Sequence, residues 1–478
     1  MIVLSYILMF LSAIFVCASF YVKFVIGENN FYENIYMIIH SVSASGTFST
    51  FWSSVKDCLL WFFLILIVFF LLNKFVFIKR RKHVLASSIF LVVSLIGLLS
   101  VMHFDEYVVN SLSSTKIYEE YYVNTNDVKI TFPKKKRNVI LIYLESMEAS
   151  LFSKENGGVF KESIIPELEE IAKENLNFSN SEKLGGAMTL DNTSCTIFSL
   201  VTSTSATPVY PRLFHPYGEN NPYMRNVRSL GNVLKENGYN LGAIQGSSIK
   251  FSAADYYLKE NGDFEVFDDD TARERGLIDK NYSVWWGMED KKVLEFSKAE
   301  ITKLSKMNEP FAYIVTTTDT HFPNGYLDET CDTPYKEHFL NSYACSSKMV
   351  SNYLEWLKKQ DFYNNTTIVI MGDHKVKQDS LYRDYKDYER SNYNAIINSV
   401  VEGHNKNRLF SQFDMYPTIL ASMGVQIDGN RIGFGVNLFS GEKTMIELLG
   451  REKFDREIFK NSDYYNKYIL SNQSNEVK

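Results

Sequence analysis

The sequence predicts an α/β protein in which N-terminal transmembrane helices precede a domain with a mostly parallel central sheet and helices on both faces. Three observations predict this fold: long apolar runs in the first hundred residues, a basic cluster between two of them, and short apolar strands that alternate with helical patterns further on. A composition of 45% hydrophobic and 22% charged residues over 478 positions excludes a disordered chain. The net charge of -6 argues against a nucleic-acid partner, because nucleic-acid-binding domains are normally basic.

Residues 1–103 are predicted to form a membrane anchor. They contain three long apolar runs, which are Ile2–Lys23, Leu59–Ile78 and Val84–Met102. A helix of about 20 residues crosses roughly 30 Å of hydrocarbon, so we expect about three transmembrane helices. A cleaved signal peptide is the alternative for the first run, but that run lacks a basic start and a clear small-residue cleavage site.

The basic residues predict the orientation of this anchor. A cluster of five, Lys79–His83, lies between the second and third runs, and the positive-inside rule places it in the cytoplasm. The third span then leads outward, so everything after about residue 104 lies outside the cytoplasm. We therefore expect a multi-pass protein of the inner (cytoplasmic) membrane whose large domain faces the periplasm or the cell exterior.

Two polar segments adjoin the predicted spans. The outer loop Gly27–Lys56 contains an amphipathic stretch, Phe31–Ser45, which we expect either to lie in the membrane interface or to form an ordinary loop helix. Residues 104–137 form a tyrosine-rich connector that ends in the basic run Lys134–Arg137. That run is either a solvated linker or a contact with anionic lipid headgroups.

Residues 138–478 are predicted to form one large α/β domain. Its apolar, strand-like runs are Asn138–Leu144, Leu241–Gln245, Phe311–Thr316 and Thr367–Met371. The helical patterns between or after them are Ile165–Glu174, Leu230–Asn237, Asp290–Lys306 and Tyr343–Lys359. Strands that are apolar throughout are typical of a parallel sheet covered on both faces. Ligands of such sheets bind beyond the carboxyl ends of the strands.

Polar side chains follow these strands where each one ends. Glu145 follows the first strand and Gly246–Ser248 the second. Asp319–His321 lies just after the third strand, and Asp373 and His374 follow the fourth. Any one of these residues alone could be a helix cap or a turn residue. Together, carboxylates and imidazoles on one rim predict a metal site, and their oxygen and nitrogen donors suit Mn, Mg or Zn.

A candidate nucleophile lies in the hydroxyl-rich segment Gly185–Pro208. A metal ion bound to a serine or threonine oxygen lowers the pKa of the hydroxyl and makes it a nucleophile. Composition alone does not choose among the hydroxyls of Thr189, Thr193, Ser194, Thr196 and Ser199, and a Ser/Thr-rich turn is the alternative interpretation. Cys331 and Cys345 lie fourteen residues apart in the outer domain, where they form either a disulfide or two free thiols.

These motifs, in this order, resemble the alkaline phosphatase/sulfatase superfamily, and within it the membrane-anchored phosphoglycerol transferases. That group includes the enzyme that decorates periplasmic glucans with phosphoglycerol, and lipoteichoic acid synthase. The resemblance covers roughly Asn138 to Gly435. It rests on NVILIYLESME, DNTSCTIFSLVTSTSATP, QGSSIKF, WWGMED, THFP and MGDH.

The resemblance implies a role for several of these residues. Thr196 would be the nucleophile, and Glu145, Thr196, Asp373 and His374 would surround one divalent cation, usually Mn²⁺, with Mg²⁺ or Zn²⁺ as alternatives. His321 would steady or protonate the leaving oxygen, a role that suits an imidazole. The substrate-binding residues implied by the same motifs are Lys250, Trp286 and His321.

The resemblance also implies a reaction. A threonine would take phosphoglycerol from phosphatidylglycerol, the membrane donor, and pass it to a hydroxyl of a periplasmic or cell-surface glycan. A phosphoethanolamine transferase acting on a lipid or glycan is the alternative, because such enzymes also use threonine, a metal and a membrane anchor. A formylglycine sulfatase is disfavoured, because Cys195 is followed by Thr-Ile-Phe-Ser rather than x-Pro-x-Arg. A non-enzymatic membrane binding protein would need the strand-end carboxylates to be coincidental.

Overall fold

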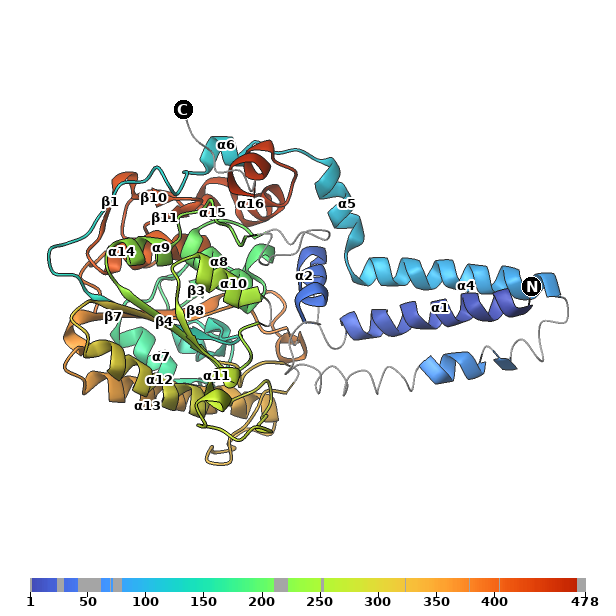
Figure 1. The fold of residues 1–478 in the computed structure, drawn as a ribbon, viewed down its shortest axis with the longest axis horizontal. Helices are drawn as coiled ribbons and strands as arrows, with labels where there is room; N and C mark the ends of the chain where they lie inside the picture. Colours follow the sequence, from blue (N-terminus) through green and yellow to red (C-terminus); the bar gives the residue numbers. More distant parts are fainter. Residues whose placement is uncertain are drawn as a thin grey trace. The chain divides into compact units, whose positions relative to one another are not determined.

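The computed structural model describes two compact units, Met1–Ser113 and Ser114–Lys478 (Figure 1). The described residues are 2–23, 30–41, 62–68, 70–71, 80–209, 222–250, 253–322, 324–377, 379–403 and 405–470. The predicted boundaries at residues 103 and 137 differ from this division, because the first helix of the connector belongs to the N-terminal unit and the remainder to the large one.

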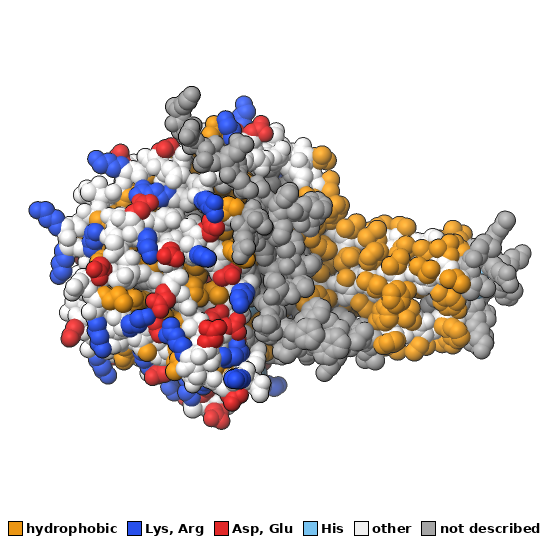
Figure 2. Space-filling model, in the orientation of Figure 1, with side chains coloured by type: hydrophobic (Ala, Val, Ile, Leu, Met, Phe, Trp, Pro, Cys, Tyr) orange, Lys and Arg blue, Asp and Glu red, His pale blue; other side chains and the backbone are white. Residues whose placement is uncertain are grey.

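The N-terminal unit is built on two long apolar helices. They are α1 (Ile2–Tyr21) and α4 (Arg80–Val101), and the hydroxyls of Ser5 and Ser87 meet between them at 3.0 Å. Their outer side chains are largely exposed apolar groups, as Figure 2 shows. Among the described residues, Val3–Tyr21 and His83–Val101 are long and apolar enough to cross a membrane. Residues 62–68 and 70–71 of the middle run are helical, and the rest of that run lies outside the described residues.

Aromatic residues hold the shorter helices of this unit together. The amphipathic stretch forms α2 (Phe31–Ser41), and α5 (Phe104–Leu112) begins the connector. The Phe31 ring lies 5.4 Å from the Phe104 ring and 4.5 Å from the Tyr107 ring, measured between centroids. Phe31, the first residue of α2, is therefore packed against α5 of the same unit.

The large unit contains a seven-stranded sheet in the order β3-β8-β7-β2-β6-β4-β5. Five strands are parallel: β2 (Asn138–Leu144), β4 (Asn240–Gln245), β5 (Glu265–Phe267), β6 (Phe311–Thr316) and β7 (Thr366–Gly372). Strand β8 (Asn392–Ile397) is antiparallel to β7, and β3 (Gly186–Ala187) is antiparallel to β8. The predicted, mostly parallel sheet is confirmed, and its four central strands match the predicted runs within one residue.

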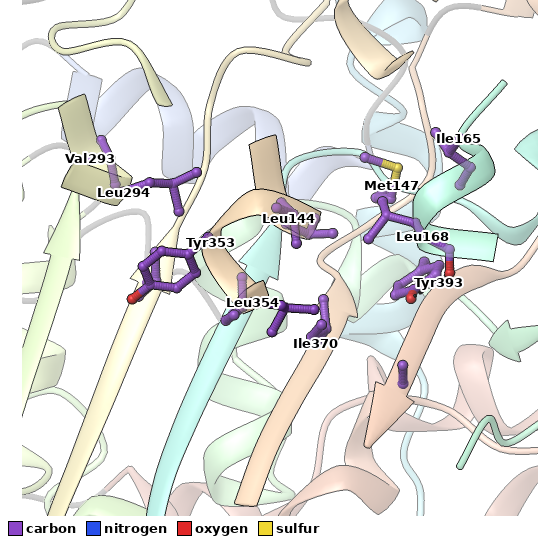
Figure 3. Packing of buried hydrophobic residues seen from close by; sticks show 14 of the residues in the cluster. Leu144, Met147, Ile165, Leu168, Val293, Leu294, Tyr353, Leu354, Ile370 and Tyr393 are labelled. Carbon is purple, nitrogen blue, oxygen red and sulfur yellow. Dashed lines mark hydrogen bonds between the residues drawn. The ribbon is translucent and has the colours of Figure 1, made fainter. Parts of the chain in front are cut away.

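Helices cover both faces of this sheet (Figure 1). One face carries α7 (Pro166–Glu174), α12 (Asp290–Ser305) and α13 (His338–Lys358), whose apolar sides pack on alternate residues of β2 and β7 (Figure 3). The other face carries α8 (Thr196–Ser205), α9 (Leu230–Glu236), α10 (Ala254–Glu260) and α14 (Met415–Ser422). Both faces of β2 are buried along its whole length, which is why that strand is apolar throughout.

Shorter elements complete the unit. They are α6 (Ile117–Tyr121), β1 (Ile130–Thr131), α11 (Asp269–Glu274), β9 (Gln426–Ile427), β10 (Arg431–Ile432), β11 (Gly435–Val436), α15 (Met445–Leu449) and α16 (Arg451–Ile458). The later connector is not a free linker, since β1 pairs with β9 and the Tyr118 hydroxyl donates to the Ile458 carbonyl.

The basic run at the end of the connector lies at the amino edge of the sheet. Lys136 donates to the Asn237 carbonyl at 2.6 Å. Arg137 donates to the Thr367 hydroxyl and to the Asn398 carbonyl. Two of the four basic side chains are thus bound within the fold, at the opposite end of the strands from Glu145 and Asp373.

Candidate active site

Two neighbouring strands bring the predicted carboxylates together. Strands β2 and β7 are parallel and adjacent, with Leu144 opposite Gly372, so Glu145 and Asp373 follow at the same edge. Both side chains are buried. Gly372 is required here, because a Cβ at this position would lie 1.8 Å from the Met147 carbonyl oxygen.

The Thr196 hydroxyl lies between these carboxylates. Thr196 is the first residue of α8, and its Oγ1 lies 2.8 Å from Asp373 Oδ2 and 3.2 Å from Glu145 Oε2. The single hydroxyl proton can be donated to only one carboxylate at a time. Donation uses only the proton, so the lone pairs of the oxygen remain available to a cation or to an electrophile.

His374 completes the group. Its Nε2 lies 3.4 Å from Glu145 Oε1 and 3.6 Å from Asp373 Oδ2. Its Nδ1 lies 2.8 Å from the Lys375 carbonyl oxygen, which can only accept, so the neutral ring carries its proton on Nδ1. Nε2 then presents a lone pair to the carboxylates, as a metal-ligating histidine does.

The donor set fits a divalent cation. Ligand atoms of Glu145, Asp373 and His374 all lie within 4.8 Å of one another. Burial, and then the nearby Asp373 carboxylate, raise the pKa of Glu145 to about 7. Two buried carboxylates at this separation repel one another unless a positive charge lies between them. Carboxylate oxygens with one imidazole nitrogen suit Mn²⁺, Mg²⁺ or Zn²⁺.

The other candidate hydroxyls are engaged elsewhere or lie inside α8. Thr189 donates to Asn392 Oδ1, Thr193 to the Leu190 carbonyl and Ser194 to the Asp191 carbonyl. Ser199 is fully buried within the helix. Of the five hydroxyls that composition left open, Thr196 is the one for which the structure gives a hydrogen bond to Glu145 and Asp373.

His321 and Trp286 lie against each other at the end of β6, on the other side of β2. Their ring centroids are 4.7 Å apart, and His321 Nδ1 lies 2.7 Å from the Phe322 carbonyl oxygen. Burial lowers the pKa of His321 to about 4, with a further lowering from Lys377. The ring is therefore neutral at pH 7, with its proton on Nδ1 and an acceptor lone pair on Nε2.

Lys250 does not join this group. Its ammonium lies 3.9 Å from Asp270 Oδ2, and its side chain is 65% exposed. Within the described residues the structure gives Lys250 no contact with Thr196, His321 or Trp286. The geometry thus brings together Glu145, Thr196, Asp373 and His374, and pairs Trp286 with His321, but leaves Lys250 at the surface.

A buried aspartate that the sequence analysis did not assign holds the His321 loop. Asp290, the first residue of α12, accepts hydrogen bonds from the Thr318 and Asp319 amides at 2.6 and 3.2 Å. Asp319 in turn accepts from the Asp290 amide at 3.1 Å. The same loop donates from the Thr320 hydroxyl to the Glu145 carbonyl. Asp290 lies in the WWGMED motif, so the sequence marked this position as part of the family resemblance but did not indicate its structural role.

We expect Asp290→Ala to destabilise the protein and misplace His321. The change leaves the Thr318 and Asp319 amides without their acceptor, and an unsatisfied buried donor costs about 1–3 kcal/mol. The free energy of unfolding should fall by roughly 2–4 kcal/mol, and catalytic activity should fall with it. Thermal unfolding and activity of the chain in detergent check both effects.

Asp290→Asn is the matched control, because it keeps one carbonyl oxygen as an acceptor. This variant should retain most of the stability that Asp290→Ala loses. Wild-type activity in a folded Asp290→Ala variant would show that the His321 loop keeps its place without this carboxylate.

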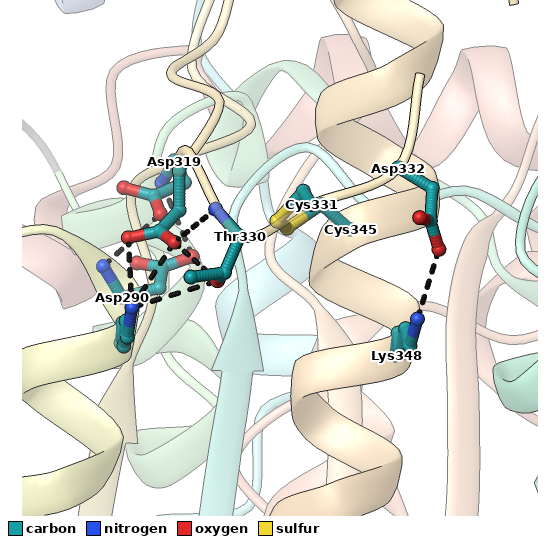
Figure 4. Close-up of a disulfide and its surroundings, with 9 residues drawn as sticks. Asp290, Asp319, Thr330, Cys331, Asp332, Cys345 and Lys348 are labelled. Carbon is teal, nitrogen blue, oxygen red and sulfur yellow. Dashed lines mark hydrogen bonds and ion pairs between the residues drawn. A yellow bond between two sulfur atoms is a disulfide. The ribbon is translucent and has the colours of Figure 1, made fainter. Parts of the chain in front are cut away.

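A disulfide lies beside this loop (Figure 4). Cys331 and Cys345 are joined, which bears out the disulfide alternative. Cys345 belongs to α13, so the bond ties the segment after Asp319 to the helix that follows it. Nearby, Lys348 pairs with Asp332 at 2.9 Å, and Lys291 with Asp328 at 3.1 Å.

The family model described as Sulfatase matches residues 137–425. Phosphoglycerol transferase I from Escherichia coli O6:K15:H31 (strain 536 / UPEC) is 27% identical over 279 residues, which are 56% of this chain and 34% of that protein. The chain thus spans about a third of the length of the curated relatives it matches.

Two solved structures are similar in fold. The lipoteichoic acid synthase LtaP from Listeria monocytogenes has a TM-score of 0.50 at 17% identity, covering 66% of this chain and 80% of that chain. The lipooligosaccharide phosphoethanolamine transferase A (EptA) from Neisseria meningitidis, an integral membrane protein, has a TM-score of 0.52 at 14% identity, covering 88% and 84%. At these identities the likeness concerns the fold alone.

Proposed function

Because the chain belongs to the sulfatase family, we propose that it transfers phosphoglycerol from phosphatidylglycerol to a hydroxyl of a periplasmic or cell-surface glycan. It is an enzyme of the sulfatase/alkaline phosphatase superfamily that is distantly related to phosphoglycerol transferase I. The observation that carries the proposal is the Thr196 hydroxyl held between Glu145 and Asp373 at the start of a helix. A hydroxyl in that place is suited to form a covalent phospho-threonine.

We assign the metal ligands to Glu145, Thr196, Asp373 and His374. When bound, one divalent cation, for which we propose manganese, lowers the pKa of the Thr196 hydroxyl and offsets negative charge on the phosphate. Asp373 accepts the hydrogen bond of that hydroxyl, which leaves the lone pairs of the Thr196 oxygen available for bonding. The α8 amino terminus directs its first amide groups at the phosphate.

The reaction then runs in two displacements. First, Thr196 Oγ1 bonds to the donor phosphorus and the bond from phosphorus to the diacylglycerol oxygen breaks, with the threonine proton reaching that oxygen through Asp373. Next, an acceptor hydroxyl oxygen bonds to phosphorus and Thr196 leaves. His321, neutral with a free Nε2, accepts the proton of the acceptor and returns it to Thr196. In this assignment His321 begins as a base rather than as the acid that the family resemblance implies.

The membrane helices fit this reaction. Two candidate spans at the N-terminus would anchor the domain in the membrane that contains the lipid donor. We propose that the chain is a multi-pass protein of the inner membrane whose catalytic domain faces the periplasm or cell exterior. Lipid donor and glycan acceptor would then meet at the carboxyl edge of the sheet.

Intact mass spectrometry tests the donor. The full-length chain in lipid with manganese is incubated with phosphatidylglycerol and, separately, with phosphatidylethanolamine. A mass gain of one phosphoglycerol unit only with the former supports the proposal. A gain of phosphoethanolamine instead would establish the alternative transferase, and release of the headgroup to water alone would indicate a hydrolase.

The low pKa of His321 predicts an unusual pH dependence. We expect His321 to cause no loss of activity as the pH falls from 8 to about 5.5, since its pKa of about 4 keeps Nε2 unprotonated. A histidine with the ordinary pKa of about 6.5 would lose its acceptor nitrogen over this interval. The measurement is kcat/KM for the acceptor against pH at saturating manganese.

Trp286→Ala provides the control for this assignment. Removing the indole admits water to the His321 ring, so its pKa rises toward the ordinary value and the acid limb of the profile moves to higher pH. An acid limb near pH 6.5 in the wild-type enzyme that does not move in Trp286→Ala would contradict the lowered pKa of His321.

A further inference from the structure

The carboxyl edge of the sheet carries a second feature, a cleft on the β8 side. One cavity of about 490 Å³ lies between the segments 154–159 and 384–388. A second, of about 430 Å³, lies between the start of α13 and the segment 381–384. Asp384 lines both cavities. The two cavities are called the rim cleft below.

The rim cleft begins beside the candidate active site. Asn324 lines its second cavity and lies three residues after His321. The Gly325 amide donates to the His321 carbonyl at 2.9 Å, and His338 Nδ1 lies 3.0 Å from the Asn324 carbonyl oxygen. The segment 381–388 connects the end of β7, where Asp373 lies, with the start of β8. A long ligand in the cleft would therefore end near His321.

Charged side chains in the cleft are left without protein partners. Arg383, Asp384, Lys386 and Asp387 are exposed, and within the described part of the chain their side chains form no hydrogen bond or ion pair. Charges elsewhere on this unit do pair, as Arg225 does with Glu260 at 3.0 Å. These basic and acidic side chains are close in sequence but do not pair with one another. Their hydrogen-bond donors and acceptors are therefore available to a ligand.

Aromatic rings lie among these charges. Tyr385 and Tyr388 are half-buried, and the Tyr388 hydroxyl donates to the Gly157 carbonyl at 2.8 Å. The Lys154 ammonium lies 5.8 Å from the centre of the Tyr385 ring. Rings fixed in this way offer flat apolar surfaces beside hydrogen-bonding groups, the combination that binds a ligand with both apolar faces and polar edges.

We propose that the rim cleft binds the acceptor of the transfer, and that this acceptor is a neutral oligosaccharide. A sugar ring has apolar C–H faces and hydroxyls that both donate and accept, which matches tyrosine rings among unpaired charges of both signs. The cleft is lined by four basic and three acidic side chains, so it lacks the uniform positive field that a polyanionic acceptor would need. This inference rests on the proposed function and deepens it.

The test separates donor cleavage from acceptor binding. The full-length chain in lipid with manganese is given phosphatidylglycerol, and diacylglycerol release is measured alone. Transfer is then measured to maltopentaose, cellopentaose and laminaripentaose, and to a phosphoglycerol oligomer. We compare wild type with Tyr385→Ala and with the double variant Asp384→Asn/Asp387→Asn. Asp332→Asn, an exposed carboxylate paired with Lys348 outside the cleft, is the control.

We expect the cleft variants to release diacylglycerol within about twofold of wild type and to raise KM for an accepted pentasaccharide about tenfold or more. The control should change neither. Unchanged KM values in both cleft variants, or transfer to the phosphoglycerol oligomer alone, would overturn the proposal while leaving the donor assignment intact.

A second measurement tests saccharide binding to the cleft even if phosphatidylglycerol is not the donor. Binding of the same pentasaccharides to Thr196→Ala is followed by saturation-transfer NMR, which needs no turnover. Binding that disappears with Tyr385→Ala supports the cleft even where phosphatidylglycerol yields no diacylglycerol, a result that would overturn the proposed function instead. If none of the three saccharides binds, the proposal that the rim cleft binds a neutral oligosaccharide is overturned.

Discussion

Replacing Thr196 by alanine is expected to abolish the covalent adduct and to lower turnover roughly 1,000-fold or more. The hydroxyl is the group that the structure places between Glu145 and Asp373. Because Thr196 is partly exposed at the first turn of α8, losing the hydroxyl should leave the fold intact. Intact mass after incubation with phosphatidylglycerol, with circular dichroism as a check of folding, measures both effects.

Two neighbouring substitutions are the controls. Thr196→Ser keeps a hydroxyl in place and should still form the adduct. Ser194→Ala removes a hydroxyl that donates to the Asp191 carbonyl and should react like wild type. An adduct on Thr196→Ala that disappears in Ser194→Ala would move the nucleophile to the neighbouring serine.

Glu145→Gln is expected to have opposite effects on stability with and without metal. With manganese, the variant loses a ligand, so we expect metal affinity to fall about 100-fold or more and activity to be lost. Ligand-induced stabilisation, about 2.7 kcal/mol when the metal is at 100 times its Kd, should shrink accordingly. Metal content by mass spectrometry and thermal unfolding with added manganese measure these changes.

Without metal, the same variant should be more stable than wild type above pH 7. Burial and Asp373 raise the pKa of Glu145 to about 7 in the folded protein, against about 4.3 in an unfolded chain. Glu145 therefore ionises at a lower pH in the unfolded state than in the folded state. The free energy of unfolding falls as the pH rises from about 4.3 to about 7. Glutamine cannot ionise, so the variant escapes this loss.

Glu169→Gln is the matched control for the metal measurement. Glu169 is also a buried glutamate, but it belongs to α7 and accepts a hydrogen bond from the Ser153 amide, away from the cluster. Its replacement should lower stability and leave metal content unchanged. Equal manganese content in Glu145→Gln and wild type would remove Glu145 from the ligand set.

The sequence alone predicted the four central strands and the position of the polar side chains that follow them. Apolar strands buried on both faces are conspicuous in a sequence, and parallel strands necessarily end at one edge. It did not predict β3, β5 or β8. Strands β3 and β5 are too short to show a pattern, and β8 contains Asn392 and Asn394, whose side chains bond the backbone at Asp373 and Phe178.

The C-terminal region after Gly435 also gave no readable motif. In the structure it forms α15 and α16, which pack against the connector and against the segment that precedes Thr196. Asp455 of α16, for example, accepts from the Asp191 amide at 3.1 and 3.0 Å. Such long-range packing leaves no local pattern for a sequence to display.

The sequence by itself determined the fold class, the apolar anchor helices and the residue types of the candidate metal site, because these follow from local periodicity and from the spacing of motifs. The family resemblance implied Thr196 as the nucleophile, but only the tertiary structure gave its hydroxyl the contacts with Glu145 and Asp373, left Lys250 at the surface and gave Asp290 a role. Those assignments depend on which side chains meet across β2, β6, β7 and α8. These contacts are set by the register between strands that lie far apart in the chain, and no local sequence pattern encodes that register.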